Sequence, residues 1–199
     1  MSSRWYHLSV SAKSRTEQAI VAAAVRTWAS ERAATLPEIA EAAAVGRTTL
    51  HRYFPVRDGL VRAAVRHALE SVGAAIAEAQ PETGHPLDAM RRVVAALASV
   101  SEAIMFVFGD QSLMRDVVPT AQPDLPTPRD PVIELIRRGQ AEGVFDSEVT
   151  AEWMQQVLWG ISYTAFEQVA QGSLAKFEVV ATVNRTLERG ITALPGGLT

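Results

Sequence analysis

TLPEIAEAAAVGRTTLHRYF, which spans residues 35–54, is the stretch of this sequence that decides its fold. Thr35 suits the N-cap of a helix, and Glu38 three residues later can reach back to complete a capping box. Pro37 is compatible with such a start because first-turn N–H groups have no intrahelical partner. These residues predict a helix that begins directly after Thr35.

A turn and a second helix follow within the same stretch. Residues 44–46, AVG, suit a short turn, and the next helix is expected from about Arg47 to Phe54, where Pro55 ends it. Leu50 and Phe54 lie four residues apart, so they share one apolar face of this second helix. The pattern predicts a helix-turn-helix.

The opposite face of the second helix is polar. Four of its residues fall at i, i+1, i+4 and i+5 and form one contiguous surface: Arg47, Thr48, His51 and Arg52. A helix with an apolar back and such a front is suited to the major groove of DNA. Two amphipathic helices in any α-helical protein would share this geometry, so geometry alone leaves that alternative open.

The residues that follow the motif add a family resemblance. LHRYFPVRDGLVRAAV, residues 50–65, resembles the signature of the TetR family of bacterial repressors, and the resemblance extends over about 50 residues, from Arg15 to Arg66. It implies a homodimer that binds a palindromic operator and is released by a small ligand. It also implies an N-terminal DNA-binding module and a variable C-terminal domain for ligand binding and dimerisation.

Four positions depart from the pattern of that family. Ala44 stands where the family usually has Gly, and a left-handed backbone there would cost Ala on the order of 1 kcal/mol. Gly46 replaces a preferred Ser as helix N-cap, and Gly is an acceptable cap. His51 replaces a Tyr that contacts phosphate in relatives. Arg57 replaces a Lys and keeps its positive charge.

The predicted DNA-binding residues fall into two groups. Those nearest the base edges are expected to be Arg47, Thr48, Thr49 and His51. Those that mainly hold phosphates are expected to be Thr35, Arg52, Tyr53 and Arg57, together with Lys13 and Arg15. The partner is double-stranded DNA.

The distribution of charge independently favours a nucleic-acid partner. Through His67 the chain carries ten Lys and Arg against five Asp and Glu, a balance of +5. The remainder carries nine against seventeen, a balance of −8, and the whole chain has a net charge of −3. Basic residues neutralise phosphates, so the N-terminal part is the one expected to bind DNA. A surface that is uneven by chance is the alternative.

Composition and motifs limit the other classes of function. The chain has no Cys and no apolar signal core or run long enough to span a bilayer, so we expect a cytoplasmic protein without a membrane partner. Its four His are scattered, and no nucleophile elbow or phosphate-binding glycine loop occurs. We therefore expect no cofactor, no metal and no enzyme activity. A helical ligand-binding or scaffold protein that does not touch DNA is the main alternative.

Hydrophobic periodicity indicates helices through almost the whole chain, with no convincing strand. We expect an all-α fold of about nine helices, in two domains at residues 1–56 and 57–194, followed by a tail at 195–199. Residues 119–131 hold five of the ten prolines and are expected to form a loop. Besides the two helices of the motif, the expected helices cover about 15–31, 57–80, 86–108, 131–143, 150–171 and 174–194.

The last two helices are predicted to form the dimer interface. The final helix carries apolar residues at the 3-4 spacing of a helical bundle, with Asn184 able to fix register. Packing within one subunit would give the same pattern, and the family resemblance favours the dimer. The predicted interface residues are Met154, Leu158, Ile161, Val180, Asn184, Leu187 and Ile191.

A small apolar or aromatic ligand is the third expected partner. Aromatic and sulfur-containing residues concentrate in the C-terminal part and are suited to line a pocket, although plain core packing is the alternative. The pocket is expected between the helix at 57–80, the helix through Phe106, and Trp159 with Tyr163. The predicted ligand-binding residues are Glu102, Phe106, Trp159, Tyr163 and Phe166.

Overall fold

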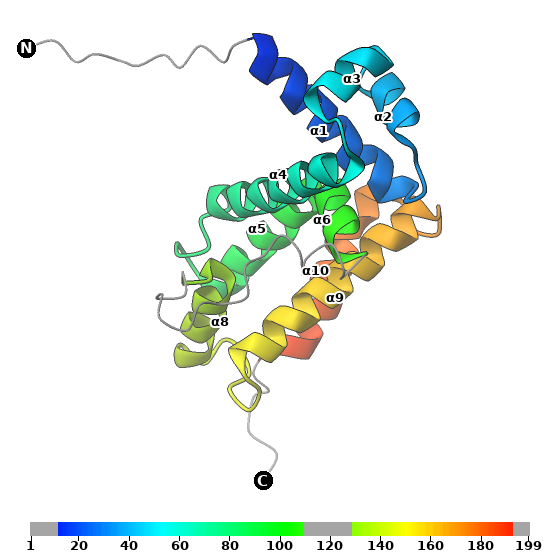
Figure 1. Cartoon of the computed structure of the whole chain (residues 1–199). Coiled ribbons are helices and arrows are strands. Elements are labelled where there is room, and N and C mark those ends of the chain that lie inside the picture. Colours follow the sequence, from blue (N-terminus) through cyan, green and yellow to red (C-terminus); the bar gives the residue numbers. More distant parts are fainter. Residues whose placement is uncertain (1–11, 110–128, 193–199) are drawn as a thin grey trace, which may run out of the picture.

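The computed structural model describes residues 12–109 and 129–192, and over these residues the fold is all-α, as the sequence predicts (Figure 1). The first four helices form the upper part of Figure 1, where α2 and α3 project beside α1 and α4 runs back toward the rest of the chain. Their bounds are α1 Ala12–Ser30, α2 Leu36–Ala42, α3 Arg47–Tyr53 and α4 Arg57–Glu78.

The remaining described elements form the C-terminal part of the molecule. They are α5 Pro86–Ser99, α6 Ser101–Phe108, α8 Pro131–Ala141, α9 Ala151–Ala170, the 3-10 helix η1 Lys176–Glu178 and α10 Val179–Ile191. A single backbone bridge joins Phe145 to Thr192. Within the described ranges, no helix is long and apolar enough to cross a membrane.

One predicted helix is divided. The sequence predicts a continuous helix at 86–108, whereas the structure breaks it at Val100 into α5 and α6. The Ser99 hydroxyl donates to the Ala96 carbonyl at 2.6 Å, the carbonyl that would accept the Val100 N–H in a regular α-helix. The Val100 N–H donates to the Leu97 carbonyl instead. A serine hydroxyl that competes for a backbone carbonyl in this way loosens the helical hydrogen-bond ladder and permits a bend.

The N-terminal core joins the helix-turn-helix to α1, to the first half of α4 and to α6. It includes Ile20 and Trp28 of α1, Ile39 of α2, Leu50 of α3 and Phe106 of α6, all buried. Helix α1 therefore covers the helix-turn-helix. The same core also uses side chains of α4 and α6, which lie beyond the predicted module at residues 1–56.

The C-terminal core is built from α5, α8, α9 and α10, and its buried residues include Leu97, Leu135, Leu158 and Leu187. Helix α5 presents a continuous apolar face to this core, and the end of α4 packs against the same cluster through Ile76. Helices α4 and α6 thus contribute to both cores, which connects the helix-turn-helix mechanically to the larger domain.

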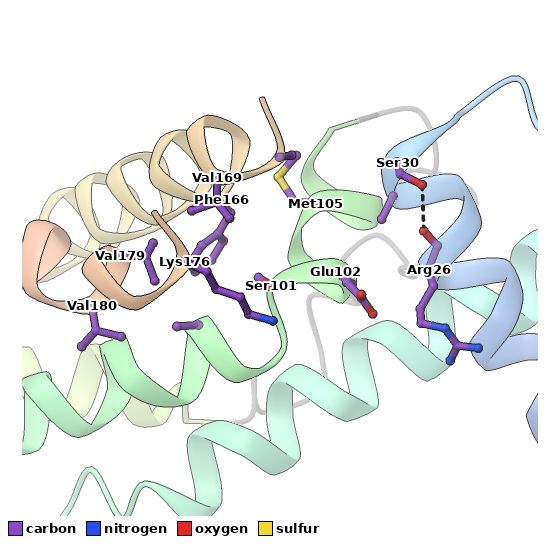
Figure 2. Close-up of a pocket in the computed structure, with 13 residues that line it drawn as sticks. Arg26, Ser30, Ser101, Glu102, Met105, Phe166, Val169, Lys176, Val179 and Val180 are labelled. Carbon is purple, nitrogen blue, oxygen red and sulfur yellow. Dashed lines mark hydrogen bonds between the residues drawn. The ribbon is translucent and has the colours of Figure 1, made fainter. Parts of the chain in front are cut away.

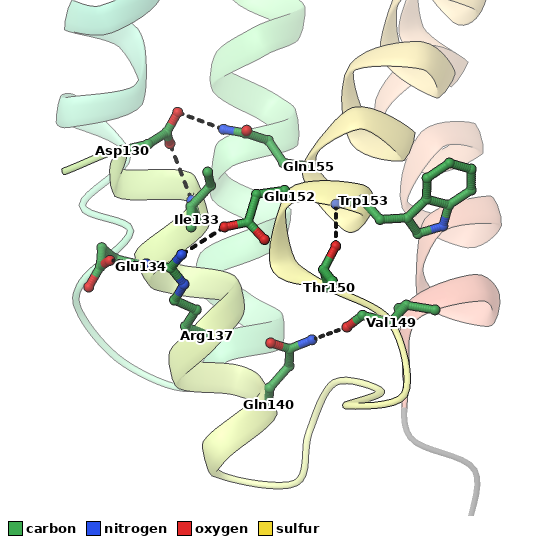
Figure 3. A network of polar contacts seen from close by, with 10 residues as sticks. All are labelled: Asp130, Ile133, Glu134, Arg137, Gln140, Val149, Thr150, Glu152, Trp153 and Gln155. Atoms are coloured by element: carbon green, nitrogen blue, oxygen red, sulfur yellow. Dashed lines mark hydrogen bonds and ion pairs between the residues drawn. The ribbon is translucent and has the colours of Figure 1, made fainter. Parts of the chain in front are cut away.

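Polar contacts fix the start of α9 against α8 (Figure 3). Arg137 forms an ion pair with Glu152 at 2.7 Å, and the Gln155 amide donates to Asp130 at 2.7 Å. The Thr150 hydroxyl accepts the Trp153 N–H and caps the helix. Figure 3 shows the Trp153 indole directed away from α8, and this side chain is 58% exposed.

Several expectations lie outside the described residues. These are the loop at 119–131 up to residue 128, the tail at 195–199 and the side chain of Lys13.

Candidate DNA-binding surface and ligand pocket

The start of the helix-turn-helix uses the predicted capping residues. The backbone N–H and the hydroxyl of Thr35 both donate to the Glu38 carboxylate, at 2.6 and 2.8 Å. The backbone hydrogen bond, followed by that of the hydroxyl, lowers the pKa of Glu38. The Thr35 hydroxyl, predicted to hold a phosphate, is thus already engaged in fixing the start of α2.

The turn between α2 and α3 has a left-handed residue at its centre. Ala44 has φ of 53°, its N–H donates to Glu41, and the next N–H, of Val45, donates to Ala40. This pair of bonds is the Schellman arrangement that commonly ends a helix, in which Gly is preferred at the left-handed position. The strain anticipated at Ala44 is therefore present.

Helix α3 has one buried and one exposed face. Leu50 and Phe54, the residue directly after α3, are buried. The exposed residues of the helix are Arg47, Thr48, His51 and Arg52. Two further predicted residues, Thr49 and Tyr53, are half-buried, and the Arg52 guanidinium lies 5.4 Å from the centre of the Tyr53 ring. The structure brings these six residues together on one short helix at the end of the molecule. Arg15 is exposed on α1.

Arg57 is exposed, and its guanidinium is held against the backbone of the loop before α2. Its guanidinium donates to the carbonyls of Ala34, at 3.0 Å, and Arg32, at 3.4 Å, and lies 5.0 Å from the centre of the Trp28 ring. The Trp28 indole N–H also donates to Ala34, at 3.0 Å. Part of the Arg57 guanidinium is therefore already engaged in clamping the loop between α1 and α2, and its predicted phosphate contact stays a prediction.

A cavity of about 390 Å³ lies where α1 meets the C-terminal domain (Figure 2). We call it the α1–α6 pocket. Its lining comes from the end of α1, the α5–α6 segment, the end of α9 and the start of α10. The lining residues that matter below are Arg26, Glu102, Met105, Phe166, Lys176 and Val180.

The predicted ligand-binding residues are divided by the structure. Glu102 and Phe166 line the α1–α6 pocket. Phe106 does not, because it stacks on Trp28 in the N-terminal core with ring centres 5.9 Å apart. Trp159 stacks on Phe108 at 5.2 Å, and neither it nor Tyr163 lines this pocket.

The pocket also differs in position from the one the sequence predicts. No lining residue belongs to α4, whereas α1 and α10 both contribute. This position could not be read from the sequence, because the lining residues of α1 and η1 are polar or small, and only tertiary packing places them beside Phe166.

The predicted dimer residues lie mostly inside the subunit. Four of them are 3% exposed or less and belong to the C-terminal core: Met154, Leu158, Leu187 and Ile191. Because these side chains are buried within one chain, they have almost no exposed area with which to contact a partner, and the structure does not support a dimer contact through them. Val180 and Asn184 are half-buried, and Val180 lines the α1–α6 pocket. The 3-4 pattern of α10 therefore describes its inner face.

The outer side of α9 and α10 carries a groove of about 430 Å³. Ile161 lies in it, beside small and polar residues. Gly160 forms part of its wall, and a Cβ added there would meet no described atom within 4 Å. Other lining residues are Thr164, Thr182 and Thr186. Of the predicted interface residues, Ile161 lies in this groove, whereas its threonines were not singled out from the sequence.

Comparison with known proteins decides the family. A family model described as bacterial regulatory proteins, tetR family, matches residues 20–64. The chain is also 34% identical over 185 residues to the HTH-type transcriptional repressor LfrR of Mycolicibacterium smegmatis, with 92% of this chain and 94% of the relative covered. The chain belongs to the TetR family of bacterial regulators.

Further similarities agree with that assignment. The TetR-family chain is 27% identical over 167 residues to the HTH-type transcriptional regulator NfxB of Pseudomonas aeruginosa, with 79% and 84% of the two chains covered. The crystal structure of LfrR from Mycobacterium smegmatis in complex with proflavine shares its fold, with a TM-score of 0.70, 29% identity, and 92% and 100% coverage. The protein is a DNA-binding transcriptional regulator, and the predicted family and fold class are confirmed.

Proposed function

We propose that this TetR-family regulator is a repressor that binds a palindromic operator as a homodimer and is released by a small ligand. The observation that carries the proposal is the exposed polar face of α3, whose opposite face is fixed in the N-terminal core. A helix held in this way can enter the major groove without rearranging its own packing. The relative with 34% identity is named as a transcriptional repressor, which favours repression over activation.

Within this proposal, the residues of α3 have distinct roles. Arg47, at the start of the helix, is placed to form two hydrogen bonds with a guanine edge, a contact for which its planar guanidinium is suited. Thr48, Thr49 and His51 complete the base-reading surface, while Arg52 and Tyr53 hold the phosphate backbone. Contacts of the second kind fix orientation and carry no sequence information directly.

The homodimer is proposed to form through the outer side of α9 and α10. The groove has a largely apolar wall that includes the small residues Gly160 and Ala165, which allow helices to approach closely. Trp153 is exposed on the same helix, and Phe177 of η1 is 87% exposed. An isologous contact of these helices would pair two recognition helices about one DNA turn apart, roughly 34–36 Å.

Ligand control is proposed from the pocket and from the relative that was crystallised with a ligand. LfrR has been crystallised with proflavine, a planar aromatic compound, and this chain contains a cavity with Phe166 and Met105 in its wall. A cytoplasmic location follows from the proposed partner, chromosomal DNA.

The experiment that tests the proposal is genome-wide selection of the DNA fragments that the purified full-length protein retains. The expected result is enrichment of one inverted repeat whose half-sites lie about one helical turn apart. Retention of DNA without any shared sequence would contradict the proposed operator binding. Enrichment of a single asymmetric site would contradict the homodimer.

A further inference from the structure

We propose that the α1–α6 pocket is an effector site for an amphipathic organic monoanion, and that the bound anion acts on the helix-turn-helix through α1 and α6. This inference rests on the proposed ligand-gated repression and assigns its site, its ligand class and its route of action. The route differs from the one expected from the sequence, which placed the ligand against α4.

The pocket has an apolar side and a charged side. Met105, Phe166 and Val180 belong to its apolar lining, while Arg26, Glu102 and Lys176 supply three charges. Figure 2 shows Phe166, Val169 and Val179 coming from the α9 and α10 side, and the charged ends of Lys176, Glu102 and Arg26 toward the α1 side. A ligand that fills the cavity would therefore need an apolar body and a polar end.

The charges of the pocket select the sign of that polar end. Two cations and one carboxylate give the lining a formal charge of +1. In the part of the chain that the structure describes, no ion pair engages Arg26, Glu102 or Lys176, since the pairs found there lie elsewhere. A monoanion such as a carboxylate or sulfonate would neutralise the site, whereas a cation would raise its charge to +2.

The size of the cavity agrees with a small organic molecule. Its volume of about 390 Å³ falls in the range of about 300–1,000 Å³ that is typical of small-molecule sites. The Phe166 ring is buried and offers a flat apolar contact. An aromatic or branched aliphatic body is therefore the form of anion that we expect.

The pocket is connected to the DNA-binding module by adjacent residues of α6. The Met105 side chain belongs to the lining, while its carbonyl accepts a hydrogen bond from the Arg32 guanidinium at 3.0 Å. The next residue, Phe106, stacks on Trp28 of α1 with an interplanar angle of 17°. Gly109 keeps this junction open, because a Cβ there would overlap the Arg32 guanidinium.

The same contacts hold the loop that leads into the motif. Trp28 and Arg57 both donate to the carbonyl of Ala34, which directly precedes the α2 N-cap Thr35. A ligand that moves α1 relative to α6 would disturb the Trp28 stack and the Arg32 hydrogen bond together. The helix-turn-helix would then change its position relative to the dimer axis.

Such an effect requires that the anion prefer the conformation that fits DNA poorly. By thermodynamic linkage, DNA must then weaken the binding of the anion by the same factor. The proposal therefore predicts two equal effects that can be measured separately.

The test uses the full-length protein and anilinonaphthalene sulfonate, an aromatic monoanion whose fluorescence rises in apolar sites. The probe is titrated into the wild type, Lys176→Glu, Glu102→Gln and Arg129→Glu, all without DNA. Arg129 is exposed and does not line the pocket, so it controls for the change in net charge. Proflavine, as an aromatic cation, is titrated in parallel.

The expected result is about ten-fold weaker probe binding to Lys176→Glu, because a charge at a partly exposed rim has changed sign. Binding to Glu102→Gln should be tighter, and binding to Arg129→Glu should equal the wild type. Equal affinity for the wild type and Lys176→Glu would overturn the site. Proflavine binding that is lost in Glu102→Gln and strengthened in Lys176→Glu would overturn the anion assignment.

The route of action is tested by the affinity for a duplex obtained from the DNA selection. The probe should weaken binding of that duplex to the wild type, and Arg32→Ala should reduce the effect while the probe still binds. A probe that occupies the pocket without changing DNA affinity would overturn the coupling, while DNA recognition itself would stand. If the wild type retains no DNA, the proposed function fails, and the fluorescence titrations still decide the site.

Discussion

The turn that presents the recognition helix α3 contains an alanine in a conformation that alanine avoids. Ala44 has φ of 53° and is exposed, so its side chain contributes little packing. Replacing it by glycine should therefore relieve backbone strain without removing a core contact. We expect Ala44→Gly to stabilise the protein.

The magnitude follows from two opposing terms. A left-handed conformation costs an L-residue roughly 1–2 kcal/mol relative to glycine, while the unfolded chain gains about 0.5–1 kcal/mol of conformational freedom when glycine is introduced. The difference is a stabilisation of roughly 0–1.5 kcal/mol, with a central value of about 0.75 kcal/mol. For a chain of this length that corresponds to a rise in Tm of about 2–4 °C per kcal/mol.

The assay is urea unfolding at a fixed protein concentration, because the stability of the proposed dimer would depend on concentration. Ala42→Gly provides a matched control, since Ala42 is also exposed but lies in the last turn of α2 with helical geometry. That change should lower the free energy of unfolding by about 0.5–1 kcal/mol. The two substitutions should thus have opposite signs.

Equal destabilisation by both substitutions would refute the reasoning, because it would mean that position 44 is not left-handed in solution. If Ala44→Gly is more stable but binds DNA less well, the result has a different interpretation. It would indicate that strain in the turn helps to orient α3.

Other substitutions test the remaining roles. Arg57→Ala should lower the free energy of unfolding by about 1–2 kcal/mol, because the hydrogen bonds and the ring contact of Arg57 are lost. The salt dependence of DNA binding should stay unchanged. If Arg57 contacts a phosphate, its removal would instead flatten that dependence. Because the pKa of Glu38 is lowered, its carboxylate stabilises the folded protein above pH 4.5, the ordinary value, and this stabilisation is lost as the pH falls through the lowered pKa. The free energy of unfolding of Glu38→Gln should therefore fall less between neutral and acid pH than that of the wild type. The same pH dependence in both proteins would contradict this contribution of Glu38. Gly160→Trp should yield monomers by light scattering while Gly73→Trp stays dimeric, since both glycines have open space for a side chain and only Gly160 lines the outer groove.

Local features of the motif could be read from the sequence because they depend on neighbouring residues. The capping pair Thr35 and Glu38, the turn at Ala44 and the buried face of Leu50 are all set by spacings of four residues or fewer. The exposed face of α3 follows from the same periodicity. The family resemblance gave the architecture of the rest.

Features that depend on tertiary packing could not be read in this way. The apolar stripe of Leu187 and Ile191 is compatible with a dimer interface or with an internal core. In the structure these residues pack in one cluster with residues of α5 and α9, so the stripe belongs to the core. Phe106 was assigned to a pocket because it is aromatic, yet the bend at Val100 turns it toward Trp28. Arg57 was predicted to hold a phosphate, and its hydrogen bonds to Ala34 and Arg32 could not be foreseen, because they depend on how the loop before α2 packs.

The most direct test of base reading by α3 is the affinity of the wild type and Arg47→Ala for the selected duplex and for a shuffled duplex of equal length. The exposed Arg47 should contribute about 1–3 kcal/mol on the selected duplex, and little on the shuffled one. Equal losses on both duplexes would show that Arg47 contacts only the backbone. An unchanged affinity on both would show that Arg47 does not contact DNA and would contradict its proposed place in the base-reading surface of α3.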